Sequence, residues 1–194
     1  MPGIVTHCYD PLYGPFGNIC TLPDAQAQRV LDSIALSGRR LVRENYLRRR
    51  RTTEAWLLSE RQRKMGAPVI EHPIYFFLGD MADDLDPSRL ESIRFPLAAL
   101  PADMLTFTFP DSMASLPLGL GLYDEHASDR RSYHGKVFTI EEIGHVIAEF
   151  GMPCGRRRTI PPVKYDRLIE VQLWDDRPLR RLSAPLSRDG IAPS

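Results

Sequence analysis

The spacing of apolar residues in the first third of the chain predicts one strand followed by two helices. The β-branched run 4–8 favours a strand, and the Gly-, Pro- and Tyr-rich stretch 10–18 behind it favours an irregular loop. Between Pro23 and Gly38 the apolar positions recur at helical spacing, at Ala27, Val30, Leu31 and Ile34. Residues 45–64 contain neither glycine nor proline, so we expect a second helix with one apolar side.

The rest of the chain predicts four more strands and one more helix. An unbroken apolar run is typical of a buried central strand, and period-2 patterns favour the others; the expected strands are 74–78, 92–95, 105–109 and 168–174. Thr139 and Glu142 have the spacing of a capping box, and the apolar stripe behind them predicts a helix that ends before Gly151. Polar stretches over 80–91 and 119–135 are expected to be exposed loops.

The last predicted strand carries a polar pair inside an otherwise apolar sequence. Side chains alternate between the two faces of a strand, so Glu170 and Gln172 share one face with Leu168 and Trp174. The opposite face carries only apolar residues, Ile169, Val171 and Leu173. A polar pair on one face of a strand calls for an explanation.

Composition and charge narrow the class of protein. With 194 residues, 43% hydrophobic and 26% charged, the chain is expected to fold as one domain over 1–183, followed by a flexible tail over 184–194. We find no apolar stretch of about 18 residues and no leader-like start, so we expect a cytoplasmic protein without membrane contact. Basic and acidic residues balance at 25 each, yet residues 39–64 hold ten basic and three acidic side chains. Any electrostatic preference is therefore local.

The common catalytic and metal-binding motifs are missing. The sequence contains no phosphate-binding P-loop, no G-x-G-x-x-G after a strand, no H-E-x-x-H and no G-x-S-x-G. Its histidines are not at ligand spacings, so no metal is predicted. The three cysteines, Cys8, Cys20 and Cys154, are scattered and are expected to be buried free thiols.

Four short motifs, spread over most of the chain, are the strongest functional signal. The first strand contains Val-Thr-His-Cys at 5–8, before a Gly-rich loop and a helix, and the middle strand contains Pro-Ile-Tyr-Phe at 73–76. A segment at 109–114 leads into small residues, and the closing strand at 170–174 begins with a glutamate and precedes Pro-Leu. The order of these motifs resembles the ADP-ribosyltransferase fold, in particular the DarT-type DNA ADP-ribosyltransferases.

This resemblance implies a fold, an activity and a set of site residues. The fold would be a single α+β domain in which a split, mainly antiparallel sheet is flanked by helices. The activity would be that of an NAD-dependent mono-ADP-ribosyltransferase acting on DNA or RNA, for example as a toxin. Glu170 would be catalytic, because a carboxylate stabilises the oxocarbenium-like cation formed when the bond from nicotinamide to ribose breaks. The residues assigned to NAD are His7, which would donate to a ribose hydroxyl, Thr6, and the aromatic wall of Tyr75 and Phe76.

The run of arginines from Arg48 to Arg51 is the expected basic part of the site. Consecutive helical residues are about 100° apart, so these four side chains face at least two environments. The arginine near the nicotinamide ribose has several candidates; we assign Arg49 as catalytic and leave Arg48, Arg50 and Arg51 to nucleic-acid phosphates. The alternative partner for these charges is the acidic loop around Asp83 and Asp84.

Two other functions stay open at this point. The same fold without catalysis would be a binding module whose basic helix docks on nucleic acid or on an acidic protein. A related enzyme, an RNA 2′-phosphotransferase, would use NAD as phosphate acceptor and needs several basic residues around one phosphate.

Overall fold

The structure, a computed structural model, describes residues 1–38, 40–80, 89–116, 131–153 and 166–182. Its strands are β1 (Ile4–Tyr9), β2 (Ile74–Leu78), β3 (Glu91–Pro96), β4 (Leu105–Thr108) and β5 (Glu170–Leu173). They form one five-stranded sheet in the order β3-β1-β2-β5-β4, and every neighbouring pair is antiparallel. With the helices around it, this sheet makes an α+β fold, as expected from the sequence.

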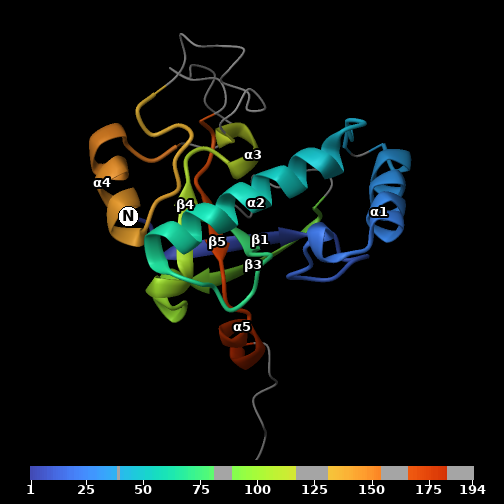
Figure 1. The fold of residues 1–194 in the computed structure, drawn as a ribbon. Helices are drawn as coiled ribbons and strands as arrows, with labels where there is room; N and C mark the ends of the chain where they lie inside the picture. Colours follow the sequence, from blue (N-terminus) through green and yellow to red (C-terminus); the bar gives the residue numbers. More distant parts are fainter. Residues whose placement is uncertain (39, 81–88, 117–130, 154–165, 183–194) are drawn as a thin grey trace, which may run out of the picture.

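The helices lie around the sheet, and α2 crosses in front of it (Figure 1). They are α1 (Asp24–Leu36), α2 (Tyr46–Met65), α3 (Ser112–Ser115), α4 (Ile140–Phe150) and α5 (Arg177–Leu182), with 3₁₀ turns η1 (Ile19–Thr21), η3 (Leu97–Ala99) and η4 (Ala102–Met104). In the view of Figure 1, α1 lies beyond one end of α2 and α4 beside the other end.

The predicted helices and strands are confirmed in order and type. The capping box at Thr139 is present, because its side chain accepts from Glu142 N and the Glu142 carboxylate accepts from Thr139 N. The short helix α5 was not expected, since its six residues contain three arginines and a proline. The backbone N–H of Arg177, its first residue, donates to Asp175 Oδ1, which stabilises the start of the helix.

The two faces of the sheet differ in chemistry. The core face, on which Val5, Phe76 and Val171 lie, belongs to the main apolar core. The α2 face carries Tyr75 and Glu170, which lie under helix α2. Residues directly opposite each other in antiparallel strands share a face, so the pairs Tyr75–Gln172 and Phe77–Glu170 place these four side chains on the α2 face.

The expected split of the sheet is not found. β2 pairs with β1 on one side, through Thr6 and Phe77, and with β5 on the other, through Ile74 and Leu173. Because both edges of β2 are hydrogen-bonded, the two halves of the sheet join into one. The prediction of 74–78 as a central strand is therefore confirmed, and the prediction of a split sheet is wrong.

Some predictions concern residues outside the described part of the chain. These include most of the loops at 80–91 and 119–135, the tail at 184–194, and Asp83, Asp84 and Cys154. Cys8 and Cys20 are buried free thiols, as expected. Among the helices that the structure describes, none combines the length and the apolar character of a membrane span.

Candidate functional site

A cavity of about 410 Å³ lies between β1, α1, the start of α2 and the α2 face of the sheet. This volume is in the range of about 300–1,000 Å³ that is typical of small-molecule sites. Three residues from distant parts of the sequence, Arg50, Tyr75 and Glu170, line it together. α1 contributes an apolar wall of Val30, Leu31 and Ile34. The cavity is thus polar at the sheet and apolar at α1.

Glu170 is buried, and among the described residues only one of its two carboxylate oxygens accepts hydrogen bonds. Ser112 N donates to Glu170 Oε1 at 3.3 Å, and Gln172 Nε2 donates to the same oxygen at 3.1 Å. Oε2 accepts no hydrogen bond from the described residues. Burial raises the pKa of the Glu170 carboxyl above its ordinary value, although Arg50 acts in the opposite direction. Because Glu170 lines the cavity, we expect Oε2 to be the oxygen that meets a ligand.

Arg50 and Tyr75 form a stacked pair on the wall of the cavity. The guanidinium carbon of Arg50 lies 3.9 Å from the centroid of the Tyr75 ring. Burial acts to lower the pKa of Arg50, but the neighbouring groups, Tyr75 and Glu170 first among them, outweigh it and raise that pKa. Burial also raises the pKa of the Tyr75 phenol well above its ordinary value. Arg50 therefore stays a cation and Tyr75 a neutral phenol.

The carboxylate of Glu54 connects Arg50 and Tyr75 to two loops. Glu54 was not among the site residues expected from the sequence. Its Oε1 accepts from Tyr75 OH at 3.0 Å and from Asn18 Nδ2 at 2.9 Å, and lies 3.3 Å from Arg50 Nε. Its Oε2 lies 2.7 Å from His72 Nδ1. The available signal was its position four residues after Arg50 in a basic helix, which places both side chains on one side of α2.

The rings of His7 and Phe76 pack together on the core face, although His7, unlike Phe76, also lines the cavity. Phe76 is fully buried and is absent from the cavity lining, because it alternates with Tyr75 along β2. The ring of His7 packs on Phe16 and Phe76, at centroid distances of 4.8 and 5.4 Å. The predicted aromatic wall is therefore Tyr75 alone.

Both ring nitrogens of His7 are used by the backbone. Phe16 N donates to Nε2 at 2.9 Å, which leaves the proton on Nδ1 to donate to Tyr75 O at 2.7 Å. Burial lowers the pKa of His7 to about 4, so the ring is neutral at physiological pH. Donation to a ribose hydroxyl, the role predicted for His7, requires a nitrogen that is already engaged here. Thr6 is also buried, and its hydroxyl donates to Gly79 O at 2.7 Å.

The arginines of α2 are distributed differently from the prediction. Arg50, assigned to nucleic acid, lines the cavity, whereas Arg49, assigned to catalysis, is half-buried and is not part of the lining. Arg51 donates to Asp24 of α1 and to Leu22 O, so its charge has a partner in α1. Arg48 is exposed, as expected of a residue available to phosphates.

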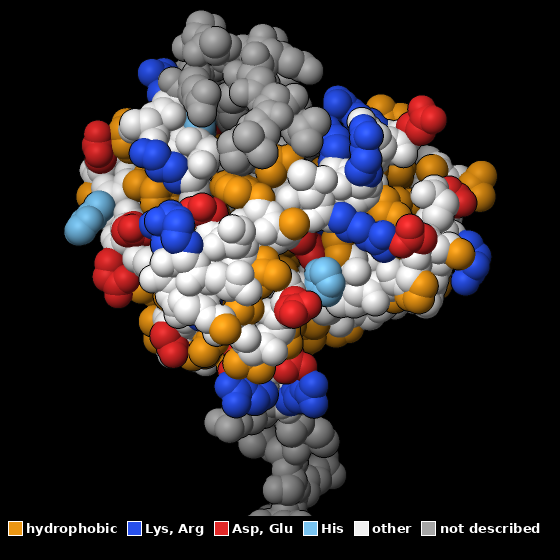
Figure 2. Space-filling model, in the orientation of Figure 1, with side chains coloured by type: hydrophobic (Ala, Val, Ile, Leu, Met, Phe, Trp, Pro, Cys, Tyr) orange, Lys and Arg blue, Asp and Glu red, His pale blue; other side chains and the backbone are white. Residues whose placement is uncertain are grey.

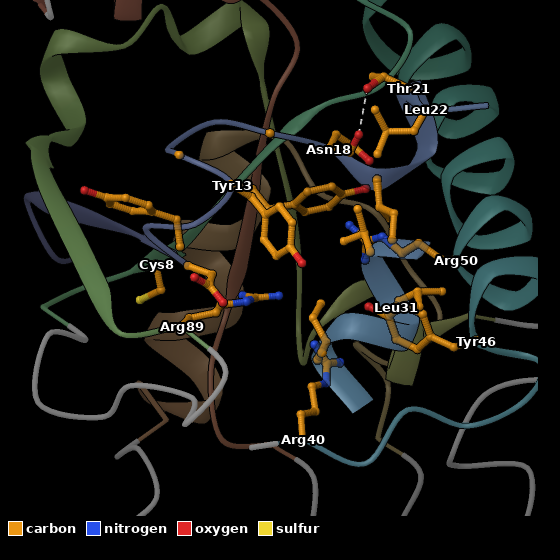
Figure 3. Close-up of a pocket in the computed structure, with 18 of the residues that line it drawn as sticks. Cys8, Tyr13, Asn18, Thr21, Leu22, Leu31, Arg40, Tyr46, Arg50 and Arg89 are labelled. Carbon is orange, nitrogen blue, oxygen red and sulfur yellow. Dashed lines mark hydrogen bonds between the residues drawn. The ribbon is translucent and has the colours of Figure 1, made fainter. Parts of the chain in front are cut away.

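Two further arginines, Arg40 and Arg89, line the cavity from loops, and neither was among the expected site residues, although Arg40 belongs to the basic stretch 39–64. Figure 3 shows both extending toward the middle of the cavity, where Tyr13 also lies. The Arg40 guanidinium lies 5.1 Å from the centroid of the Tyr46 ring, and that of Arg89 lies 5.9 Å from the Phe77 ring. Together with Arg50 they make the cavity suited to an anionic ligand with flat groups.

Within the described ranges, no group of three or more His, Cys, Asp or Glu side chains is placed to hold a metal ion. Comparisons with protein-family models, with curated proteins and with solved structures found no match. The family resemblance read from the motifs therefore stays a prediction, and the geometry of the cavity is the basis for a function.

Proposed function

We propose that this protein is an NAD-dependent ADP-ribosyltransferase and that the cavity is its NAD site. The observation that carries the proposal is the meeting of Glu170, Tyr75 and Arg50 in one cavity of about 410 Å³. A carboxylate can stabilise the cation formed when the bond from nicotinamide to ribose breaks, an aromatic ring can stack on nicotinamide, and an arginine can donate charge-assisted hydrogen bonds. Glu170 and Tyr75 were expected at such a site from the sequence, and they lie on one sheet face, on adjacent strands.

The proposed reaction uses Glu170 as an electrostatic stabiliser. The bond between C1′ of the ribose and the nicotinamide nitrogen breaks, and the electron pair leaves with nicotinamide, which becomes neutral. An acceptor oxygen or nitrogen then forms a bond to C1′ and loses its proton to solvent. Glu170 Oε2, which has no donor among the described residues, accepts from a ribose hydroxyl and stabilises the cation at C1′.

The arginines of the cavity hold the anionic part of the ligand. Arg40 and Arg89 come from loops at its edge and bind the pyrophosphate through charge-assisted hydrogen bonds. Arg50 is mostly buried and lies against Glu54 and Tyr75, so it supplies the positive charge of the polar wall that these three side chains form. His7 acts indirectly, because its ring fixes the loop at Phe16.

Nucleic acid is the proposed acceptor. Arg43 and Arg48 are exposed at the start of α2, and Figure 2 shows basic side chains gathered over this end of the helix, next to α1. A basic surface beside a reactive site favours contacts with phosphates, which weaken steeply with salt.

The test is a thermal-shift titration with NAD, followed by an assay of NAD consumption. Binding to the native state stabilises it by about 2.7 kcal/mol when the ligand is at 100 times its Kd. We expect Glu170→Gln to keep binding and to lose roughly 100–1,000-fold in turnover. Glu149→Gln, on the exposed side of α4, is the matched control and should behave as wild type. A wild-type protein that neither binds nor consumes NAD would refute the proposal.

A second candidate, the RNA 2′-phosphotransferase, is favoured by one observation. Arg40, Arg50 and Arg89 line the same cavity, and this reaction needs several basic residues around one phosphate. The assay therefore includes an RNA with a 2′-phosphate, with and without NAD, and loss of that phosphate only with NAD would select this candidate. Salt-sensitive nucleic-acid binding that Glu170→Gln leaves unchanged, without NAD consumption, would indicate the binding module.

A further inference from the structure

A chain of buried hydrogen bonds crosses the α2 face of the sheet and ends on Glu170. Trp174 Nε1 donates to Thr106 Oγ1 at 2.8 Å, and Thr106 Oγ1 donates to Gln172 Oε1 at 2.9 Å. Gln172 Nε2 donates to Thr108 Oγ1 at 3.2 Å and to Glu170 Oε1 at 3.1 Å. Thr106, Thr108, Gln172 and Trp174 are all fully buried.

The direction of this chain follows from the chemistry of its ends. The indole N–H of Trp174 only donates, so Thr106 accepts from it and retains its own hydrogen for Gln172. That hydrogen requires an acceptor, which turns Gln172 Oε1 toward Thr106 and Gln172 Nε2 toward Glu170. The orientation of one buried amide is thus set by a threonine on the neighbouring strand.

We propose that Gln172 is the positioning residue of Glu170, and that Thr106 holds the Gln172 amide in the orientation that donates to Glu170 Oε1. This inference rests on the proposed function, because it assigns to Gln172 the task of keeping Oε2 toward the cavity. A reversed amide would bring Gln172 Oε1 against the carboxylate, where two acceptors repel each other.

Other groups act on Glu170 as well, and the test leaves them in place. Arg50 from α2, Tyr75 from β2 and Asp111 ahead of α3 are the charged or titratable groups that face it. Ser112 N is its second hydrogen-bond donor. None of these groups contacts Thr106 or Thr108 in the chain described above, so variants of the two threonines leave them in place. Thr106→Val also removes the acceptor of the Trp174 indole N–H, a loss that the Gln172 variant below does not share.

The experiment compares Thr106→Val with Thr108→Val. Both remove one hydroxyl next to Gln172 and keep the shape of the side chain. Only the first removes the donor that orients the amide, because in the second Thr106 still donates to Gln172 Oε1. The first readout is the pKa of Glu170, measured by NMR of carboxyl-labelled protein without any ligand. The second is the pH profile of NAD consumption, with KM and kcat determined separately.

In Thr106→Val we expect the pKa of Glu170 to rise by roughly one unit, because its carboxylate loses a donor. We expect kcat to fall roughly 10–100-fold, with a smaller change in KM. The acid limb of the pH profile of NAD consumption should move to higher pH. Thr108→Val should keep the wild-type pKa and profile. Equal effects of the two variants, or an unchanged pKa in Thr106→Val, would overturn the inference.

A further variant keeps the test decisive if Thr106→Val does not fold. Gln172→Met removes the donor and retains the length of the side chain, so it should raise the pKa of Glu170 as well, and an unchanged pKa would count against Gln172. The ligand-free pKa also separates the two proposals. If NAD is not consumed by wild type, the proposed function fails, while the pKa comparison still decides whether Gln172 positions Glu170.

Discussion

Arg50 stacks on Tyr75, with its guanidinium carbon 3.9 Å from the ring centroid, while both side chains contact the carboxylate of Glu54. Stacking of this kind contributes about 0.5–2 kcal/mol, with the larger values at sites removed from water. The three side chains come from α2 and β2, so they tie the helix to the sheet at the wall of the cavity. The polar wall is therefore part of the fold as well as of the site.

The first prediction concerns the choice between Arg50 and Arg49. Arg50→Lys keeps the charge but removes the planar group that stacks on Tyr75 and bonds to Glu54, so we expect NAD turnover to fall roughly 10–100-fold. Arg49→Lys makes the same chemical change outside the cavity and should keep turnover within about twofold. Steady-state kinetics measure both, with circular dichroism as the check on folding. A larger effect at Arg49 would restore it as the catalytic arginine.

The second prediction concerns Glu54. Glu54→Gln retains the shape of the side chain but removes the ion pair of the mostly buried Arg50 with Glu54, so we expect the free energy of unfolding to fall by about 3 kcal/mol. Glu60→Gln is the matched control on the same helix, because the pair of Glu60 with Arg63 is far more exposed and should change the free energy of unfolding much less. Urea unfolding measures both values. A loss at Glu54 no greater than at Glu60 would show that the Glu54 contacts do not hold α2 to the sheet.

The sequence was sufficient to predict the strands, the main helices and the meeting of Glu170 with Tyr75. The strands can be recognised because their apolar residues either alternate with a second face of different chemistry, as in 168–174, or form an unbroken run, as in 74–78. Alternation alone places Glu170 and Gln172 together on one face. What it does not supply is the neighbour across the sheet, and Thr106 reaches Gln172 only through the pairing of β4 with β5.

The roles of the arginines and of His7 depend on tertiary packing. Consecutive residues of a helix differ by about 100°, and only the placement of α2 on the sheet shows that Arg50 rather than Arg49 turns toward the cavity. His7 was expected near NAD because of the resemblance of the motif at 5–8, yet a loop residue, Phe16, occupies its second nitrogen. Such a contact between a loop and a strand leaves no periodic signal in the sequence.

The third prediction is that Glu170 lowers the stability of the fold at neutral pH. Its pKa is raised in the folded protein, so the folded state binds the proton more tightly, and stability is lost as the pH rises through that folded pKa. Glu170→Gln removes this loss, and we expect a melting temperature at pH 7.5 at least equal to that of wild type. The difference should vanish below the ordinary pKa range of a glutamate, about 4.3. Calorimetry between pH 4 and pH 8 measures it, and a less stable variant at pH 7.5 would contradict the prediction.

The fourth prediction is the opposite dependence at His7. Its pKa is lowered from 6.5 to about 4 in the folded protein, so the unfolded state binds the proton more tightly between these values. The stability associated with neutral His7 is fully present above pH 6.5 and is lost as the pH falls toward 4, by about 3 kcal/mol in all. Protonation would place a hydrogen on Nε2, where Phe16 N already donates, so the loop at Phe16 should open first.

His7→Asn tests this dependence against His145→Asn, on the exposed side of α4. Urea unfolding at steps between pH 4 and pH 7 should show a shallower slope for His7→Asn than for wild type, even if the variant is less stable at every pH. His145→Asn should keep the wild-type slope. Hydrogen exchange at the Phe16 amide measures opening of the loop itself, and in wild type the protection of this amide should fall between pH 7 and pH 4. Loss of protection without a change in the unfolding slope would show that the loop opens independently of the charge on His7.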